Sequence, residues 1–397
     1  MMPRGIHTIP AQGNVLRWAR EVRGFTRKTA ARLLGITEQE LAAIEDGRQE
    51  PPGTVFNKMV SVYQQVESVL LLPRPPATDP LPEDYRTVGG APAMPRPDTL
   101  LAIREARRVQ RYVSELVGDD PELLRHPDIP TASVTEDPED RGLRERQRSG
   151  VTMQRIRGWK PYRDAFGRWR AIVQEMGILV LQKNMPWEDC RGFSLWETGT
   201  VPMIVVNSED AFNGRIFTLF HEYAHLMLRQ TGTCVAAVQN ETPKGRIERW
   251  SDSFAAAFLV PADDLRRAIK GRFPNLASDS WTLWHIERLA AHFRVSPYVI
   301  ARRLKEQGIS DFYDKNYREL RQSDKRRERP PREQTGGIRA EILKLSEVGL
   351  GAASVVLEAL RGQLIDGPEA ADILGLRLDQ LRAFEEQTEV QRSRSRI

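Results

Sequence analysis

The chain has 397 residues, of which 40% are hydrophobic and 28% charged, a balance that is ordinary for globular domains. Its net charge of +5 is too small to indicate a dedicated nucleic-acid surface by itself. The two cysteines have no metal or redox spacing, no secretory leader is recognisable, and no apolar run reaches the roughly 18 residues that span a bilayer. We therefore expect several domains, no membrane association and a reducing compartment, by default the cytoplasm.

The first third of the chain is predicted to be helical, with one linker. Residues 13–72 place apolar side chains at helical spacing. Closely spaced prolines from Pro73 to Pro97 predict an extended linker, because proline lacks the backbone donor that a helix needs. One helix is expected over 98–118, and the charged, proline-containing segment 119–150 is expected to be loop.

A second compact unit begins near Val151 and mixes helices with strands. Branched apolar runs at 178–181 and 201–206 are typical of strands. Helical periodicity recurs in five later segments, namely 162–176, 214–229, 247–259, 286–307 (as two helices) and 339–386. The expected fold class is α+β and mostly helical, with a small twisted sheet packed beside the helix at 214–229 and all-α modules flanking it.

These patterns divide the chain into seven parts. In chain order we expect a helix-turn-helix at 1–72, a proline-rich linker at 73–97, a helical connector and loop at 98–150, a core of helices and strands at 151–275, a helical, helix-turn-helix-like segment at 276–310, a basic linker at 311–338 and a helical module at 339–397. The pattern Ala-Ala-x-Leu-Leu-Gly-Ile at 30–36 returns as Ala-Ala-x-Ile-Leu-Gly-Leu at 370–376, and more loosely at 290–300. Such a pattern predicts two helices joined by a tight turn.

The residues with the clearest chemistry are His221, Glu222 and His225, which form an H-E-x-x-H motif inside a segment of helical period. A spacing of four residues puts both imidazoles on one face of a helix, one turn apart, where they can share a metal ion. Imidazole suits Zn²⁺, and the glutamate between the ligands can take a proton from the water that attacks a carbonyl. The motif therefore predicts a zinc hydrolase.

A catalytic zinc site needs a third protein ligand, and Glu248 on the next predicted helix is the best candidate. Asp252 lies one turn further along the same face, where it can orient a ligand histidine by accepting its second N–H. The competing interpretation is that both carboxylates are ordinary exposed helix charges. His285 and His292 could also face the site, although such histidines are more often plain core or surface residues.

The segments around this motif resemble the ImmA/IrrE family of metallopeptidases. The resemblance rests on three stretches, namely an apolar strand ending in asparagine (202–207), the Phe-Thr-Leu-x-His-Glu-x-x-His run (217–225) and the Glu-x-x-x-Asp-x-Phe-Ala-Ala run ending in proline (248–261). The chain departs from the family pattern at Asp252, where asparagine is frequent, and at Phe258, where leucine is usual.

The resemblance implies a function as well as a site. It implies that residues 151–275 are a zinc metallopeptidase core, in which His221, His225 and Glu248 bind Zn²⁺ and Glu222 is the general base. The expected substrate is a specific protein, such as a transcriptional repressor or an antitoxin-like partner, cleaved in a regulatory or stress response. We also expect the substrate to pair with an exposed edge of the strand at 201–207. The residues of this predicted binding edge are Ile204, Val205, Val206 and Asn207.

Residues 14–72 resemble Cro/repressor-type helix-turn-helix domains, which implies a helix from Thr37 onward that enters the major groove. The residues expected at DNA are Thr37, Glu38, Gln39 and Arg48. Nine basic and seven acidic residues in 1–72 predict no strong basic face, so docking to a protein remains the alternative. The same ambiguity applies to the whole chain, which is either a regulated zinc endopeptidase or a DNA-binding or antitoxin-type regulator that uses the peptidase fold for binding alone. The sequence does not specify an oligomeric state.

Overall fold

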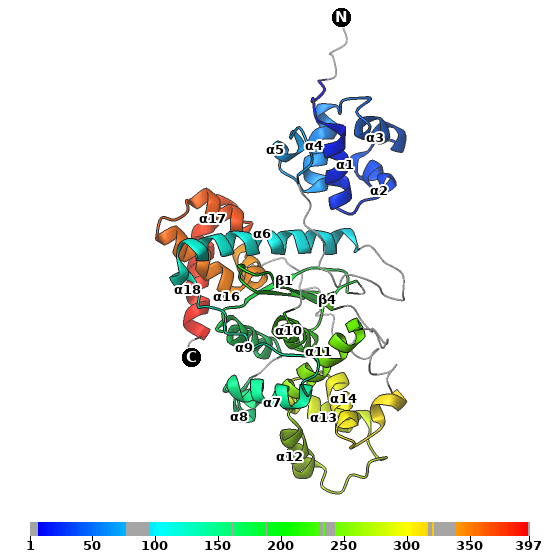
Figure 1. The fold of residues 1–397 in the computed structure, drawn as a ribbon, viewed down its shortest axis with the longest axis vertical. Helices are drawn as coiled ribbons and strands as arrows, with labels where there is room; N and C mark the ends of the chain where they lie inside the picture. Colours follow the sequence, from blue (N-terminus) through cyan, green and yellow to red (C-terminus); the bar gives the residue numbers. More distant parts are fainter. Residues whose placement is uncertain are drawn as a thin grey trace, which may run out of the picture. The chain divides into compact units, whose positions relative to one another are not determined.

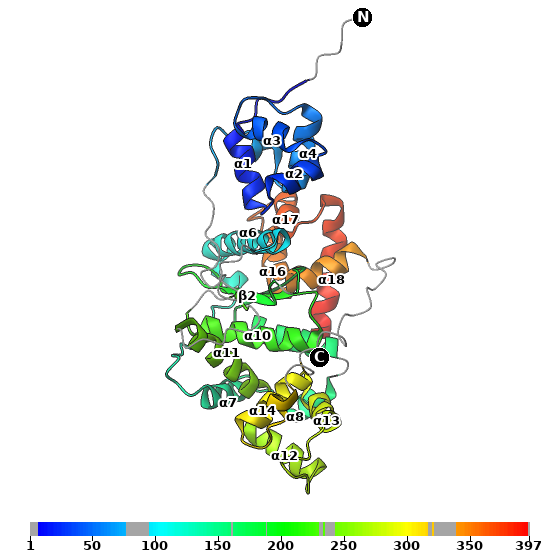
Figure 2. The same cartoon turned by 90° about the vertical axis from the view of Figure 1, so that its right-hand side faces the viewer.

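The computed structural model describes residues 7–76, 95–159, 162–187, 189–229, 233–234, 243–316, 320 and 339–395. They form two compact units, shown in two views in Figures 1 and 2. Over the described residues, the first unit comprises 7–76 and 95–104, and the second begins at residue 105. Within the described residues, no helix combines the length and the apolar character needed to cross a membrane.

The first unit is built from short helices around one apolar core. Its helices are α1 (Gly13–Val22), α2 (Arg27–Leu34), α3 (Glu38–Glu45), α4 (Gly53–Tyr63) and α5 (Glu67–Leu70). Thr26 caps α2, and Gly35 ends it with φ of 75°, a left-handed conformation that favours glycine. Thr37 and Glu40 then form a capping box at the start of α3. These local preferences fix the helix–turn–helix before any packing is considered.

Helix α6 (Pro97–Asp119) begins in the first unit and continues into the second, and it is followed by a 3-10 turn at Pro121–Leu123. The prediction of loop over 119–150 was wrong for α7 (Pro138–Arg148), a helix capped by Asp137. The buried face of α7 consists of Arg141, Gly142, Glu145 and Arg146. Because that face is polar or lacks a side chain, the helix has no apolar periodicity for a sequence pattern to detect.

The sheet of the second unit has four strands in the order β1-β3-β2-β4. They are β1 (Leu179–Lys183), β2 (Gly192–Leu195), β3 (Met203–Asn207) and β4 (Thr233–Cys234). Strand β3 pairs in parallel with β1 and antiparallel with β2, and β2 pairs antiparallel with β4. The predicted substrate edge at Ile204, Val205, Val206 and Asn207 is therefore wrong, because β3 is an interior strand with both sides paired.

Helices cover this sheet and extend beyond it. In chain order they are α8 (Met153–Gly158), α9 (Tyr162–Gln174), α10 (Phe212–Met227), α11 (Pro243–Leu259), α12 (Ala262–Arg272), α13 (Leu283–Phe293), α14 (Pro297–Glu306), α16 (Ala340–Arg361), α17 (Gly367–Leu374) and α18 (Leu381–Ser395), with a 3-10 turn at Leu378–Gln380. Helix α10 packs against β2, β3, α9 and α11, so it lies at the centre of the unit. The α+β, mostly helical fold with a small sheet beside the motif helix is confirmed.

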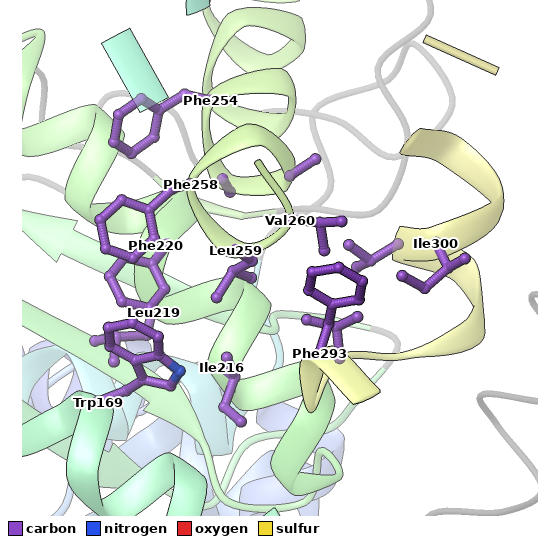
Figure 3. Packing of buried hydrophobic residues seen from close by; sticks show 14 of the residues in the cluster. Trp169, Ile216, Leu219, Phe220, Phe254, Phe258, Leu259, Val260, Phe293 and Ile300 are labelled. Atoms are coloured by element: carbon purple, nitrogen blue, oxygen red, sulfur yellow. The ribbon is translucent and has the colours of Figure 1, made fainter. Parts of the chain in front are cut away.

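Aromatic side chains hold α9, α10 and α11 together. Phe220 of α10 stacks on Phe258 of α11 with ring centroids 4.1 Å apart, and Trp169 of α9 meets Phe220 edge-on at 5.0 Å (Figure 3). All three side chains are fully buried, and burial of each contributes about 2–3 kcal/mol to folding. This packing fixes the spacing between α10 and α11, the two helices that carry the predicted metal ligands.

The C-terminal helices pack against strand β1 through α16. Helix α16 breaks at Gly349, whose φ of 77° a side chain would strain, and a β-carbon there would lie 2.7 Å from the carbonyl oxygen of Val180. The guanidinium of Arg170 donates to the carbonyl oxygens of Val180 and Ser346 at 3.0 and 2.6 Å. These contacts cover the outer edge of β1 with helix.

Candidate metal centre

Helix α10 presents both histidines of the motif on one face inside the molecule. His221, Glu222 and His225 are each at most 1% exposed, and the two imidazole Nε2 atoms lie 3.1 Å apart. The helix is buried on nearly every side, because the sheet and neighbouring helices cover it. Burying two facing imidazoles away from water costs free energy unless they bind a shared ion or another partner.

Glu248 of α11 completes the group. Its Oε2 lies 3.3 Å from Nε2 of His221, and its Oε1 lies 3.5 Å from Nε2 of His225. Three ligands held tetrahedrally at the Zn–N and Zn–O distances found in proteins would be about 3.3–3.4 Å apart. The two imidazole nitrogens are 3.1 Å apart, and each oxygen of Glu248 lies within 3.5 Å of one of them, so the three residues are close enough to share one divalent ion.

Asp252, one turn along α11 from Glu248, accepts a hydrogen bond at Oδ1 from Nδ1 of His221, 2.9 Å away. A histidine that binds a metal through Nε2 carries its proton on Nδ1, so this bond fixes the tautomer and the ring orientation. The other oxygen, Oδ2, lies 2.7 Å from Nη1 of Arg302 on α14. Asp252 therefore links α10 and α14 through its two oxygens.

The charges of this group are matched to metal binding. Burial raises the pKa of Glu248, but the neighbouring imidazoles of His225 and His221 outweigh it, so the net shift is downward. The same balance lowers the pKa of Asp252, where burial is outweighed by the guanidinium of Arg302 and by His221. Both carboxylates are therefore ionised at neutral pH. The ionised form is the one in which Glu248 can bind a metal and Asp252 can orient His221.

Glu222, between the two ligands, lies where α10 meets strand β2. A β-carbon at Gly192 of β2 would be 2.5 Å from Cγ2 of Thr218, 2.7 Å from the oxygen of Val205 and 3.7 Å from Cγ of Glu222. Only glycine permits this approach of strand to helix. The sheet and the motif glutamate are thereby brought together at the residue that the prediction assigned as general base.

Three residues near the motif or considered for the site make contacts with other groups. Tyr223, within the motif, contacts α7, where its hydroxyl donates to Glu145 at 3.0 Å and accepts from Arg148 at 2.8 Å. Burial raises the pKa of Tyr223, so it stays a neutral hydroxyl. His285 caps α13 by accepting from the backbone of Thr282 at 3.2 Å, and His292 contacts Arg272. Neither histidine joins the metal-binding group found among the described residues.

The residues predicted at DNA lie on the surface of the first unit. Thr37 is the cap of α3, Glu38 and Gln39 are exposed in its first turn, and Arg48 is exposed and paired with Asp46 at 2.8 Å. Glu40 is held by the capping box, where its Oε2 accepts from the backbone of Thr37 at 2.7 Å. The exposed start of α3 is therefore acidic and amide-bearing, with little positive charge of its own.

A buried carboxylate anchors the same helix. Glu45 at the end of α3 is 2% exposed and accepts from Arg20 at 2.6 Å and from Arg27 at 3.1 Å, so it joins α3 to α1 and α2. Arg17 lies 4.0 Å from it and also pairs with Asp46. These arginines are consequently occupied within the domain and contribute little to an external basic face.

An H-E-x-x-H helix joined to a glutamate on a following helix defines a metallopeptidase-type centre. Residues 173–305 match the model of the M78 peptidase family, described as the IrrE N-terminal-like domain, and residues 13–70 match the model of a helix-turn-helix domain. The chain therefore carries an ImmA/IrrE-type domain behind a helix-turn-helix domain, which confirms the resemblance seen in the sequence.

More distant likeness is limited. A solved Mycobacterium tuberculosis transcriptional regulator is 15% identical, with 49% of this chain and 51% of that chain covered and a TM-score of 0.28. The chain thus spans about half the length of that protein. No curated protein matches the chain significantly.

Two residues at this centre escaped the sequence analysis. Arg302 contacts Asp252 from 50 positions away, and no local pattern connects the two. Gly192 lies in strand β2, which was not predicted because its four residues are too short to show alternation. The one available clue was that Gly192 begins the short stretch Gly-Phe-Ser-Leu. A glycine in a strand often marks a place where another part of the chain approaches the backbone closely.

Proposed function

We propose that the protein is a zinc-dependent endopeptidase of the ImmA/IrrE type that hydrolyses a peptide bond in a specific protein partner. The observation that carries the proposal is the buried group of His221, His225 and Glu248, whose ligand atoms all lie within 4.8 Å of one another, with Glu222 between the two histidines. Two buried imidazoles and a carboxylate gathered at one point support a shared metal ion, because such groups are costly to bury without a partner.

In this proposal each residue has a distinct role. His221, His225 and Glu248 would hold the ion, and Asp252 orients His221 through its Nδ1 proton. Zinc, when bound, supplies a Lewis acid that polarises the scissile carbonyl and acidifies water. Glu222 takes the proton of the attacking water and delivers it to the leaving amine.

The substrate would be a repressor or antitoxin-like protein, and the cleavage would act in gene regulation or stress response inside the cytoplasm. An extended peptide requires a free strand edge, which β3 does not have. Among the described strands, β4 is the last on the side opposite β1 and pairs with Gly192 and Phe193 of β2, so we propose that side of the sheet for a substrate. The helix-turn-helix domain would direct the peptidase to DNA or to a partner at a promoter.

The decisive experiment compares wild type with Glu222→Gln in cells. Proteins that lose abundance and gain new N-termini only with wild type are identified by mass spectrometry, and purified substrate is then cleaved in vitro. We expect Glu222→Gln to keep its zinc, measured by elemental analysis, and to lose at least about 100-fold in cleavage rate, because a general base contributes about 10²–10⁴-fold. Glu175→Gln, at an exposed position after α9, is the matched control and is expected to cleave normally.

Two outcomes would reject the proposal. Absence of zinc from the purified wild type removes the metal chemistry altogether. Equal substrate loss with wild type and Glu222→Gln, both holding zinc, would instead favour the alternative, a regulator that uses the peptidase fold for binding without turnover.

A further inference from the structure

The second helix–turn–helix of this chain, α13–α14, resembles the first in its connection but not in its surroundings. Helix α13 ends at Arg294 in the left-handed region, with φ of 58°, and Ser296 caps α14. The buried residues of α14 are Val299, Ile300, Ala301, Arg303 and Leu304. Its first turn, residues 297–299, has no exposed residue, whereas a helix that reads DNA presents its N-terminal residues to the base edges, so α14 is not placed to enter a groove.

One side chain of α14 reaches the metal centre. Arg302 donates from Nη1 to Oδ2 of Asp252 at 2.7 Å, from Nη2 to Oγ of Ser253 at 3.1 Å and from Nε to Oε1 of Glu306 at 2.8 Å. Its side chain is only 14% exposed. Three nitrogens bound to three partners in a mostly buried setting leave the guanidinium a single orientation.

A continuous series of contacts leads from this guanidinium to the ligand atoms. Arg302 contacts one oxygen of Asp252, the other oxygen accepts from Nδ1 of His221, and Nε2 of His221 lies 3.3 Å from Glu248. Because both oxygens of Asp252 are engaged, rotation of its carboxylate would break one bond or the other. The orientation of His221 therefore depends on a residue of the hairpin.

We propose that Arg302 is a positioning residue of the metal centre, and that docking of the α13–α14 hairpin on α11 sets the metal affinity through Asp252 and His221. The inference rests on the proposed zinc site. Linkage makes the effect reciprocal, since whatever the docked hairpin adds to metal affinity, the bound metal adds to docking.

The neighbouring arginine supplies a control for plain structural damage. Arg303 is 1% exposed in its side chain, pairs with Glu139 at 2.7 Å and donates to the carbonyl oxygen of Val260 at 2.9 Å. It thus belongs to the same helix and makes comparable polar contacts, but its contacts do not include Asp252. If polar anchoring of α14 were all that mattered, replacing either arginine would affect zinc binding alike.

The test is a double-mutant cycle on zinc affinity, measured on the full chain by competition with a chromophoric chelator. We expect Asp252→Asn to weaken zinc binding about 10–100-fold and Arg302→Gln to weaken it about 3–10-fold, because outer contacts of metal ligands carry effects of this order. In the Asp252→Asn background, Arg302→Gln is expected to change affinity less than about twofold, since the two residues act in series. Arg302→Lys should restore part of the loss, because the ammonium keeps the charge on Asp252.

The control and the contrary results are equally specific. Arg303→Gln is expected to lower the urea midpoint but to leave zinc affinity within about twofold of wild type. Zinc affinity unchanged by Arg302→Gln, or lowered equally by Arg303→Gln, overturns this inference and leaves the proposed function standing. A wild type without zinc overturns both. Should Arg302→Gln fail to fold, Arg302→Lys takes its place in the same cycle. The inference is then supported if Arg302→Lys lowers zinc affinity in the wild-type background and leaves it unchanged in the Asp252→Asn background.

Discussion

The hairpins α2–α3 and α13–α14 share one local plan, a helix ended by a left-handed residue and a second helix started by a hydroxyl cap. They differ in what surrounds the second helix. The first turn of α3 leaves Glu38 and Gln39 exposed, whereas the first turn of α14, residues 297–299, has no exposed residue. The charged side chains of the two second helices also have different partners. Glu45 of α3 is bound to Arg20 within its own domain, and Arg302 of α14 is bound to Asp252 beside the metal ligands.

This contrast teaches that a helix–turn–helix connection specifies a shape and not a function. Capping and turn preferences act over a few residues, so they produce the same hairpin wherever the residues recur. An exposed second helix can bind DNA or a protein. A buried second helix can instead contribute a side chain to a site formed by other helices, as Arg302 of α14 does at the metal centre. The following experiments break or sharpen the comparison, in order of their expected effect on folding.

Removal of the buried carboxylate should affect only the first hairpin. Glu45→Ala leaves the guanidinium groups of Arg20 and Arg27 without their shared partner, so we expect the first unit to lose about 3–5 kcal/mol of unfolding free energy. Hydrogen exchange in the full chain should show faster exchange over residues 13–45 and unchanged exchange over 283–306. Glu67→Ala, at an exposed position in α5, is the control and should stay within about 0.5 kcal/mol. Faster exchange in both hairpins would contradict their energetic independence.

Metal removal should affect only the second hairpin. At a free zinc concentration about 100 times the dissociation constant, binding stabilises the folded domain by about 2.7 kcal/mol. Chelation is therefore expected to speed amide exchange in α10, α11 and α14, while residues 13–45 exchange as before. The comparison of zinc-loaded and chelated protein by hydrogen-exchange mass spectrometry checks this. Equal protection of α14 from exchange in both states would contradict coupling between the hairpin and the metal centre.

Substitution on the exposed face of α3 should hardly change folding, but it should change recognition. Gln39→Ala is expected to alter stability by less than about 0.5 kcal/mol, because the side chain is exposed. If α3 reads DNA, this variant loses about 1–3 kcal/mol of discrimination at one base pair, whereas Lys305→Ala on α14 loses none. Binding measured over a range of salt concentrations tests the alternative, because a helix that docks to protein shows no phosphate-dependent salt slope.

Local patterns predicted the elements that have strong periodicity or a turn glycine. The motif helix around His221 and His225, the strand at β3 and the first hairpin followed from the spacing of apolar residues, from branched apolar runs or from glycine. Helix α7 was missed because its buried face is made of Arg141, Gly142, Glu145 and Arg146, and β2 was missed because it is short. In both, neighbouring elements stabilise a structure that the local sequence does not indicate.

The sequence by itself determined which residue types are available for chemistry, because a helix of known period places His221 and His225 one turn apart regardless of context. It could not determine the position of β3 within the sheet, since strand order depends on pairing between distant segments, and the predicted edge was wrong for that reason. Only the tertiary structure brought Glu248 within 3.5 Å of the histidines and Arg302 within 2.7 Å of Asp252. Contacts across tens of residues arise from packing of whole helices, and packing is a property of the folded chain and not of any segment in it.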